Sequence, residues 1–353
     1  AGVTIACLLV IVRQVDVGEV LRAASDFQWT YLLPGIASLA AGYALRIARW
    51  SMLLRATGAA ATFRNCSVPF LGSIALNNVF PLRMGDVVRA LVFPMSMGIT
   101  RTVATASLVM ERLIDLTTLL ACFAVGFLAV QKLEVPQPIR QSAVYLSIFT
   151  ATALVCGLLF SADLGRFFFA KAGATAGAGD QRLVRVYSTI GGLLTGFGTM
   201  ARPRVLAGAV VLSLMVWVGE AGLFYFMLLG FGMEATATMA LLVMAVATLS
   251  TLAPSSPGYI GPFHLAAFMA ISSMGGTSAQ AGSYAVLVHL ALWLPTTLAG
   301  AIAIASSPNI ARRVLTGAKV ELMQHVPVRP LADRKDEIRK LLENLEKMLP
   351  CED

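Results

Sequence analysis

The residues best suited to chemistry lie between Asn77 and Asp115, where charged side chains interrupt apolar sequence. A break containing Pro and Gly carries Arg83, Asp86 and Arg89. A guanidinium stays charged and binds an oxyanion through two parallel hydrogen bonds, so both arginines suit a phosphate group. Snorkelling of an arginine to the membrane interface is the alternative, and it fits Arg89 better than Arg83.

Three further ionisable residues follow on one expected helix. Glu111 and Asp115 are four residues apart and therefore share a helix face, with Arg112 beside them. We expect the two acids to carry a proton or to hold Arg83 and Arg112 in place, and Arg112 to contribute to a phosphate site. A cluster of charges at a helix end among lipid head groups is the alternative.

The second half of the chain offers fewer polar residues. Glu220 lies near the middle of an apolar stretch, where it could bind a cation, carry a proton or pair with an arginine of another helix. Ser256 and Gly258 belong to a second Pro/Gly break, whose free backbone groups could line a cavity. His264 beside this break could titrate near neutral pH. The other two histidines are interpreted as structural.

The composition indicates a polytopic helical membrane protein. Hydrophobic residues make up 57% and charged residues 13% of the chain, whereas a soluble domain carries about 25% charged residues. The apolar runs are continuous and about 20 residues long, which favours helices over a membrane barrel. The net charge of +8 follows from Lys and Arg at helix ends, so no nucleic-acid partner is expected. No Cys or His spacing predicts a metal, a cofactor or a disulfide framework.

These residues require about six spanning helices and two broken segments to position them. The breaks at 81–86 and 254–262 each separate two apolar pieces that are too short to span a hydrocarbon core of about 30 Å. We expect the pieces 66–80 with 87–97, and 236–253 with 263–274, to enter the membrane and return. The spanning helices are expected at 1–12 (the remainder of a truncated helix), 29–54, 102–130, 141–160, 205–230 and 281–306.

Both halves of the membrane domain, about 1–160 and 180–306, repeat one order of elements. Each has a helix, a short apolar segment, a break, a short apolar piece and a long helix. Arg-rich loops, including the basic region 161–204, are expected on the cytoplasmic side, and this orients the two halves oppositely. An inverted repeat with two broken helices meeting near the midplane is typical of transporters. Coincidence among apolar segments is the alternative.

Taken together, ALRIARW, NNVFPLRMGDVVRA, MERLIDL and LAPSSPGYIGPF resemble the lysylphosphatidylglycerol synthase transmembrane-region family over about residues 1–306. The resemblance implies a flippase-like inner-membrane domain that moves or presents a lipid head group. Asp86 is a mild departure, because Glu is commoner there. Only the tail 307–353 follows, too short for an aminoacyl-transferase domain, so we do not expect an enzyme. The matching positions are Asn78, Pro81, Arg83, Gly85, Asp86, Arg89, Glu111, Arg112, Asp115, Pro254, Ser256, Pro257, Gly258 and Gly261.

The leading hypothesis is a multi-pass flippase or transporter of the bacterial inner membrane for an anionic or phosphate-linked lipid, either a phospholipid or a polyprenyl-phosphate-linked glycolipid. One alternative is a non-catalytic subunit that presents a lipid to a separate transferase. Another is a membrane scaffold. A cytoplasmic amphipathic helix at 333–349 would then recruit a partner or a second copy. The expected substrate-binding residues are Asn78, Arg83, Asp86, Arg89, Arg112, Ser256 and Gly258, and the expected charge-coupling residues are Glu111, Asp115 and Glu220.

Overall fold

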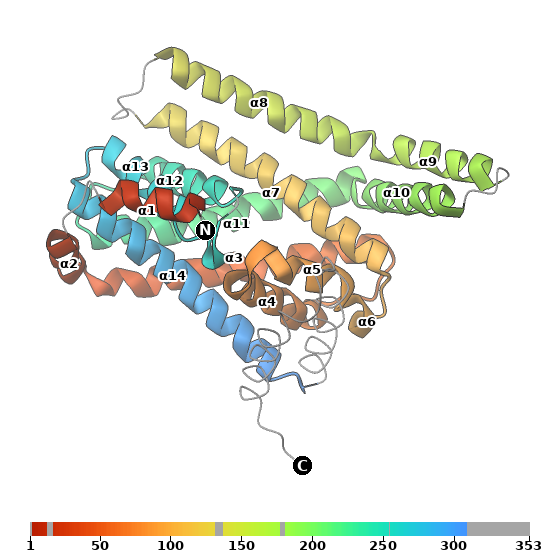
Figure 1. The fold of residues 1–353 in the computed structure, drawn as a ribbon, viewed down its shortest axis with the longest axis horizontal. Helices are drawn as coiled ribbons and strands as arrows, with labels where there is room; N and C mark the ends of the chain where they lie inside the picture. The colour runs from red at the N-terminus through yellow and green to blue at the C-terminus, as the bar shows by residue number, and fades with distance from the viewer. Residues whose placement is uncertain (1, 13–16, 131–136, 177–180, 254, 309–353) are drawn as a thin grey trace, which may run out of the picture.

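The computed structural model describes residues 2–12, 17–130, 137–176, 181–253 and 255–308 (Figure 1). This part of the chain is helical and contains no strand, which confirms the predicted all-α fold. Four of its helical segments are long and apolar enough to cross a membrane. The total of about six spans stays a prediction, and so does the tail helix at 333–349, which lies outside the described residues.

The long helices begin and end within a few residues of their expected bounds. Two details differ: the piece 87–97 is divided into two helices, α5 and α6, and the basic region 161–204 forms a pair of helices, α9 and α10. The elements are α1 (Gly2–Val12), α2 (Val17–Ser25), η1 (Trp29–Tyr31), α3 (Leu32–Ala56), α4 (Phe63–Val79), η2 (Pro81–Arg83), α5 (Met84–Leu91), α6 (Pro94–Met97), α7 (Arg101–Ala129), α8 (Gln137–Leu159), α9 (Ser161–Ala176), α10 (Gln181–Met200), α11 (Pro203–Gly230), α12 (Ala237–Ser250), η3 (Pro257–Tyr259), α13 (Pro262–Ser273) and α14 (Ser278–Ala305).

Threonine caps begin corresponding helices in the two halves. Thr62 and Thr236 cap α4 and α12, the short helices that lead into the breaks. Thr100 and Thr277 cap α7 and α14, the long helices that follow the breaks. In each case the hydroxyl accepts a hydrogen bond from the backbone N–H three residues on, which satisfies one of the unpaired donors of the first turn.

Two similar five-residue sequences end at the second pair of capping threonines. The chain reads Ser-Met-Gly-Ile-Thr at 96–100 and Ser-Met-Gly-Gly-Thr at 273–277. Gly98 and Gly275 have positive φ angles of 66° and 91°. Glycine adopts this conformation without steric cost, so each can reverse the chain between a short helix and a long one. The repeat is therefore visible in residues as well as in hydropathy.

Helix packing follows the same repeat. Helix α3 packs along α11, its counterpart in the second half. The short helix α4 packs on α14 from the other half, and in the same way the short helix α12 packs on α7. This exchange of partners is the arrangement that an approximate two-fold axis between the halves produces. The opposite orientation of the two halves in a membrane stays a prediction.

Small residues allow α3 and α11 to approach closely. A Cβ atom added to Gly219 would lie 3.0 Å from the Cα of Gly42 and 3.0 Å from the carbonyl oxygen of Ser38. The Ser38 hydroxyl also donates a 2.8 Å hydrogen bond to the Gly219 carbonyl. Close backbone approach through small residues is a common way for membrane helices to associate. It brings Arg46 of α3 next to Glu220 of α11.

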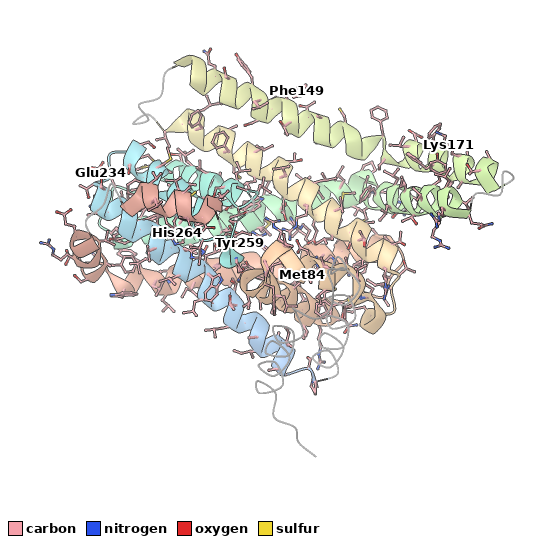
Figure 2. The ribbon with its side chains drawn as sticks, in the orientation of Figure 1. Met84, Phe149, Lys171, Glu234, Tyr259 and His264 are labelled. Atoms are coloured by element: carbon pink, nitrogen blue, oxygen red, sulfur yellow. The ribbon has the colours of Figure 1, made fainter. Side chains whose placement is uncertain are left out.

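The outer helices present apolar side chains to the surroundings. Phe149 on α8 is 72% exposed and points away from the other helices (Figure 2). The pair α9 and α10 extends beyond the rest of the fold, with Lys171 near its far end (Figure 2). An apolar outer surface is what hydrocarbon surroundings favour, because exposed apolar groups cost nothing there.

Candidate functional site where the two breaks meet

The two breaks have the same backbone conformation. Each is a three-residue turn that starts with proline, Pro81–Arg83 in the first half and Pro257–Tyr259 in the second. In each turn the second and third residues have left-handed angles, and these include Leu82, Arg83 and Tyr259. They are the positive-φ residues other than glycine in the described part of the chain. Such strain persists only where surrounding contacts impose it, and it often accompanies function.

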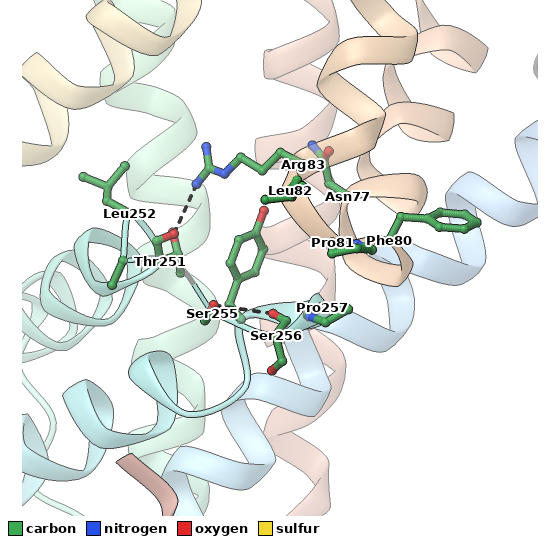
Figure 3. A pocket seen from close by; sticks show the side chains of 13 residues that line it. Asn77, Phe80, Pro81, Leu82, Arg83, Thr251, Leu252, Ser255, Ser256 and Pro257 are labelled. Carbon is green, nitrogen blue, oxygen red and sulfur yellow. Dashed lines mark hydrogen bonds between the residues drawn. The ribbon is translucent and has the colours of Figure 1, made fainter. Parts of the chain in front are cut away.

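A cavity of about 270 Å³ lies between the breaks (Figure 3). The guanidinium of Arg83 reaches across it, with Nη2 3.5 Å from the Thr251 carbonyl oxygen and its carbon 5.5 Å from the centre of the Tyr259 ring. The predicted meeting of the two broken segments is thus present in the fold. The lining residues are Asn77, Phe80, Pro81, Leu82, Arg83, Thr251, Leu252, Ala253, Ser255, Ser256, Pro257, Gly258 and Tyr259.

A buried ion-pair network lies behind this cavity. Arg49, whose side chain is 1% exposed, pairs with both oxygens of Asp115, and its Nη2 lies 2.9 Å from Oδ2. The same nitrogen is 3.4 Å from Oε1 of Glu111. Ser213 adds a hydroxyl between Arg49 and Asp115. Glu111 and Asp115 therefore lie inside the fold and share one arginine, which excludes a surface position at a helix end.

Arg89 is enclosed by the same network. Its guanidinium pairs with Glu111 and lies 4.0 Å from the ring centre of Trp50 and 4.5 Å from that of Phe70. Its side chain is 3% exposed. Aromatic faces attract a cation more strongly when water is excluded. Binding of a substrate by Arg89 stays a prediction, but in this structure its polar partner is Glu111.

Arg112 and Asp86 form a more accessible pair. Nη2 of Arg112 lies 2.8 Å from each oxygen of Asp86, and 41% of the Arg112 side chain is exposed. Asn77 donates a 2.9 Å hydrogen bond to Asp86 and accepts one of 3.1 Å from its backbone N–H. This pair connects the cavity wall at Asn77 to α7.

Arg46 joins the second half to the network. It pairs with Glu220 of α11, and its Nη1 lies 4.0 Å from Oδ2 of Asp115. Thr248 of α12 donates a 3.4 Å hydrogen bond to Glu220. The guanidinium also lies 4.8 Å from the ring centre of Trp217. Of the interpretations open for Glu220, the structure shows pairing with an arginine across the helices.

Arg83 differs from the four arginines of the buried network in having no carboxylate within 4.0 Å among the described residues. The network contains four other arginines and four acids, so these charges balance. Arg83 adds one uncompensated positive charge at the cavity. The balanced set is Arg46, Arg49, Arg89 and Arg112 with Asp86, Glu111, Asp115 and Glu220.

The structure distributes the other predicted residues between the cavity and its wall. Ser256 and Gly258 line the cavity. Asn78 is part of the wall instead, because its amide donates hydrogen bonds to Thr296 at 3.2 Å and Thr297 at 2.9 Å. His289 lies behind the second break, with Nε2 2.7 Å from the Gly258 carbonyl oxygen.

Sequence reasoning missed several residues of the site. Arg46 and Arg49 are not among the expected site residues, but both lie well inside α3 and belong to the buried network. Arg49 precedes the last residue of α3, Ala56, by seven positions, or about 10 Å. This distance from the end of an apolar helix is the sequence feature that could have identified Arg49 as a buried residue. Asn77 and Tyr259 lie within the motifs NNVFPLRMGDVVRA and LAPSSPGYIGPF but were not among the expected binding residues. The described residues contain no group of His, Cys, Asp and Glu arranged to hold a metal ion.

The helical fold and the charged site between two broken helices define a polytopic membrane protein with a buried polar centre. A family model for the lysylphosphatidylglycerol synthase TM region matches residues 1–300, and the chain belongs to this family, as the resemblance predicted. No curated protein and no solved structure matches the chain. Membership supports a lipid-related role in a membrane.

Proposed function

We propose that this protein moves a lipid with a phosphate-containing head group between the leaflets of a bacterial inner membrane. The cavity between the breaks would receive the head group, and Arg83 would bind its phosphate through two hydrogen bonds. Ser256 stands on the opposite wall and would complete the polar surroundings, and the ring of Tyr259 lies beside Arg83. The broken segments would enter the membrane from opposite sides and meet at this cavity.

The charge balance of the buried centre carries the proposal. Arg83 is half-buried at the cavity, and a charge at membrane depth costs several kcal/mol unless it is paired or faces water, so a bound anion is a partner that this arginine could take. A phosphodiester carries one negative charge and would neutralise Arg83. The rival interpretation, in which Arg83 only neutralises Asp86, Glu111 or Asp115, has less support, because these acids already pair with other arginines.

The three acids would have a supporting role. Glu111, Asp115 and Glu220 hold Arg49, Arg89 and Arg46 in place, and the proximity of Arg46 to both Asp115 and Glu220 offers a route for coupling between the halves. We further propose that the chain has no catalytic role and that its C-terminus is cytoplasmic. Presentation of a lipid to a separate transferase is the second candidate, since it would use the same head-group cavity.

Lipid binding and transport by purified, folded protein test this function. Losing a hydrogen bond to a charged group costs about 1.5–3 kcal/mol, so Arg83→Gln should weaken lipid binding roughly ten- to hundredfold. Arg83→Lys should recover only part of the loss, because an ammonium lacks the planar fork. The control is Arg166→Gln, since this arginine is exposed on α9, a helix that contributes no residue to the cavity. Parental binding and transport by both Arg83 variants would refute the phosphate site.

A further inference from the structure

A second cavity, of about 320 Å³, lies on the other side of the wall that contains Asn78. It is a groove between α3, α4 and α14, and we call it the tail groove. Its residues are Ile36, Leu39, Ala40, Tyr43, Ala44, Ile47, Phe63, Ser67, Leu71, Pro295, Thr296 and Ala299. We propose that the tail groove binds one hydrocarbon chain of the lipid whose phosphate lies at Arg83, an inference that rests on the proposed function.

The chemistry of the lining selects an apolar occupant. Aliphatic side chains dominate it, and two of its three hydroxyl groups are engaged by their own helices. Ser67 donates to the Phe63 carbonyl at 2.7 Å, and Thr296 donates to the Leu292 carbonyl at 2.8 Å. A polar ligand would therefore lose hydrogen bonds with water that this groove does not replace.

The position of the tail groove identifies that occupant as a lipid chain. Two of its walls, α3 and α14, are helices long enough to cross the membrane, and Ala40, Ala44 and Ala299 are exposed along it. The groove is therefore open to the hydrocarbon region in which membrane lipids keep their tails. A volume near the lower end of the usual range for ligand sites, about 300–1,000 Å³, suits one chain.

The wall between the two cavities is thin. Thr296 lines the tail groove and accepts a hydrogen bond from Asn78. Trp293, three residues earlier on α14, donates a 3.3 Å hydrogen bond to the Asn78 carbonyl and approaches Gly258 of the head-group cavity. Trp293 and Thr296 belong to one turn of α14 and are about 4.5 Å apart along its axis, so side chains of a single turn border both cavities.

Photo-crosslinking tests the tail groove directly. The protein is reconstituted into vesicles of phosphatidylethanolamine and phosphatidylglycerol that contain a trace of phosphatidylglycerol with a diazirine in one acyl chain. Labelled peptides should come from α3, α4 and α14. Ala44→Phe should reduce this labelling about tenfold, which corresponds to lost burial of about two methylene groups. Ala299→Phe fills the tail groove from another helix and should have the same effect.

Ala41→Phe is the matched control, because Ala41 is exposed on α3 but does not line the tail groove. Its labelling should equal that of the parent. Equal losses in Ala41→Phe and Ala44→Phe would show that the probe reports surrounding lipid, and this would overturn the proposal. Parental labelling in both groove-filling variants would also overturn it, as would crosslinks between two protein copies at these helices.

Binding of glycerol 3-phosphate separates this inference from the proposed function. This probe has a phosphate and no tail, so Ala44→Phe and Ala299→Phe should bind it like the parent, and Arg83→Gln should bind it more weakly. If Arg83→Gln binds it normally while the groove-filling variants lose labelling, the phosphate site is wrong and the tail groove stands. If all three variants lose glycerol 3-phosphate binding, the two cavities are not separate sites and the inference fails.

Discussion

Substitution of Arg49, which forms an ion pair with Asp115, tests which buried charges stabilise the fold and which bind the substrate. Arg49→Gln leaves the side chain polar but removes the cation that Asp115 and Glu111 share. Asp115 then retains the Ser213 hydroxyl and one cation within 4.0 Å, Arg46, whose closer partner is Glu220. We therefore expect Arg49→Gln to destabilise the fold far more than Arg83→Gln, which removes no carboxylate partner among the described residues.

The magnitude follows from burial. Arg49 is 1% exposed, and removing one partner of a buried pair costs about 3–5 kcal/mol, because the remaining charge has no solvent. Glu111 keeps Arg89, which limits the loss to the lower part of that range. For a chain of this size a loss of about 3 kcal/mol corresponds to a decrease of roughly 4 °C in the unfolding midpoint.

Thermal unfolding in detergent, followed by intrinsic fluorescence, gives the measurement. The double variant Arg49→Gln with Asp115→Asn removes one charge of each sign and restores the balance. It should therefore unfold at a higher temperature than Arg49→Gln alone, with a coupling of about 1.5–3 kcal/mol between the two positions. Additive losses from the two substitutions would refute the pairing, and so would an Arg49→Gln midpoint equal to that of the parent.

Two other substitutions examine the breaks. Gly85→Ala should prevent native packing of α5 on α4, because its Cβ would lie 1.8 Å from the Ser73 carbonyl oxygen. The control is Gly173→Ala, whose Cβ would meet nothing within 4 Å. It should leave the unfolding midpoint unchanged or slightly raised. An equal midpoint for the two alanine variants would contradict the close approach of these helices. Tyr259→Leu should weaken lipid binding by about 0.5–2 kcal/mol through loss of the aromatic face beside Arg83, and Tyr259→Phe should bind like the parent. Equal losses for Tyr259→Phe and Tyr259→Leu would show that the hydroxyl, and not the ring, is the contact.

The sequence predicted the arrangement of elements better than the partners of individual charges. Length and hydropathy located the long helices, and Pro81 and Pro257 located the breaks, because proline cannot continue a helix without losing a hydrogen bond. The meeting of the breaks was also predictable from their repeated order. These features depend on local sequence, so they can be predicted without knowledge of the tertiary fold.

The pairing of charges depends on contacts between distant helices. Glu111 and Asp115 were expected to carry a proton or to hold Arg83 and Arg112 in place, but the arginine that both acids share in the structure is Arg49 of α3. An arginine near a helix end looks the same in sequence whether it faces head groups or reaches inward. The close packing of α3 on α11 depends on glycines such as Gly42 and Gly219. This packing determines that Arg46 and Arg49 contact acids inside the fold.

The unequal division of the buried charges has a consequence for biogenesis. Helix α7 carries Glu111, Arg112 and Asp115, and at about 2.5–3.5 kcal/mol each they would make it a poor candidate to enter a bilayer alone. Their partners lie on α3 and α5, which come earlier in the chain and are therefore synthesised first. These segments can remain at the insertion machinery until α7 is synthesised. The second half contributes one charged residue, Glu220, together with the hydroxyls of Ser213 and Thr248, so we expect its helices to enter the lipid singly. The first half therefore has to partition into the bilayer as a group of helices, with its ion pairs formed before lipid surrounds it.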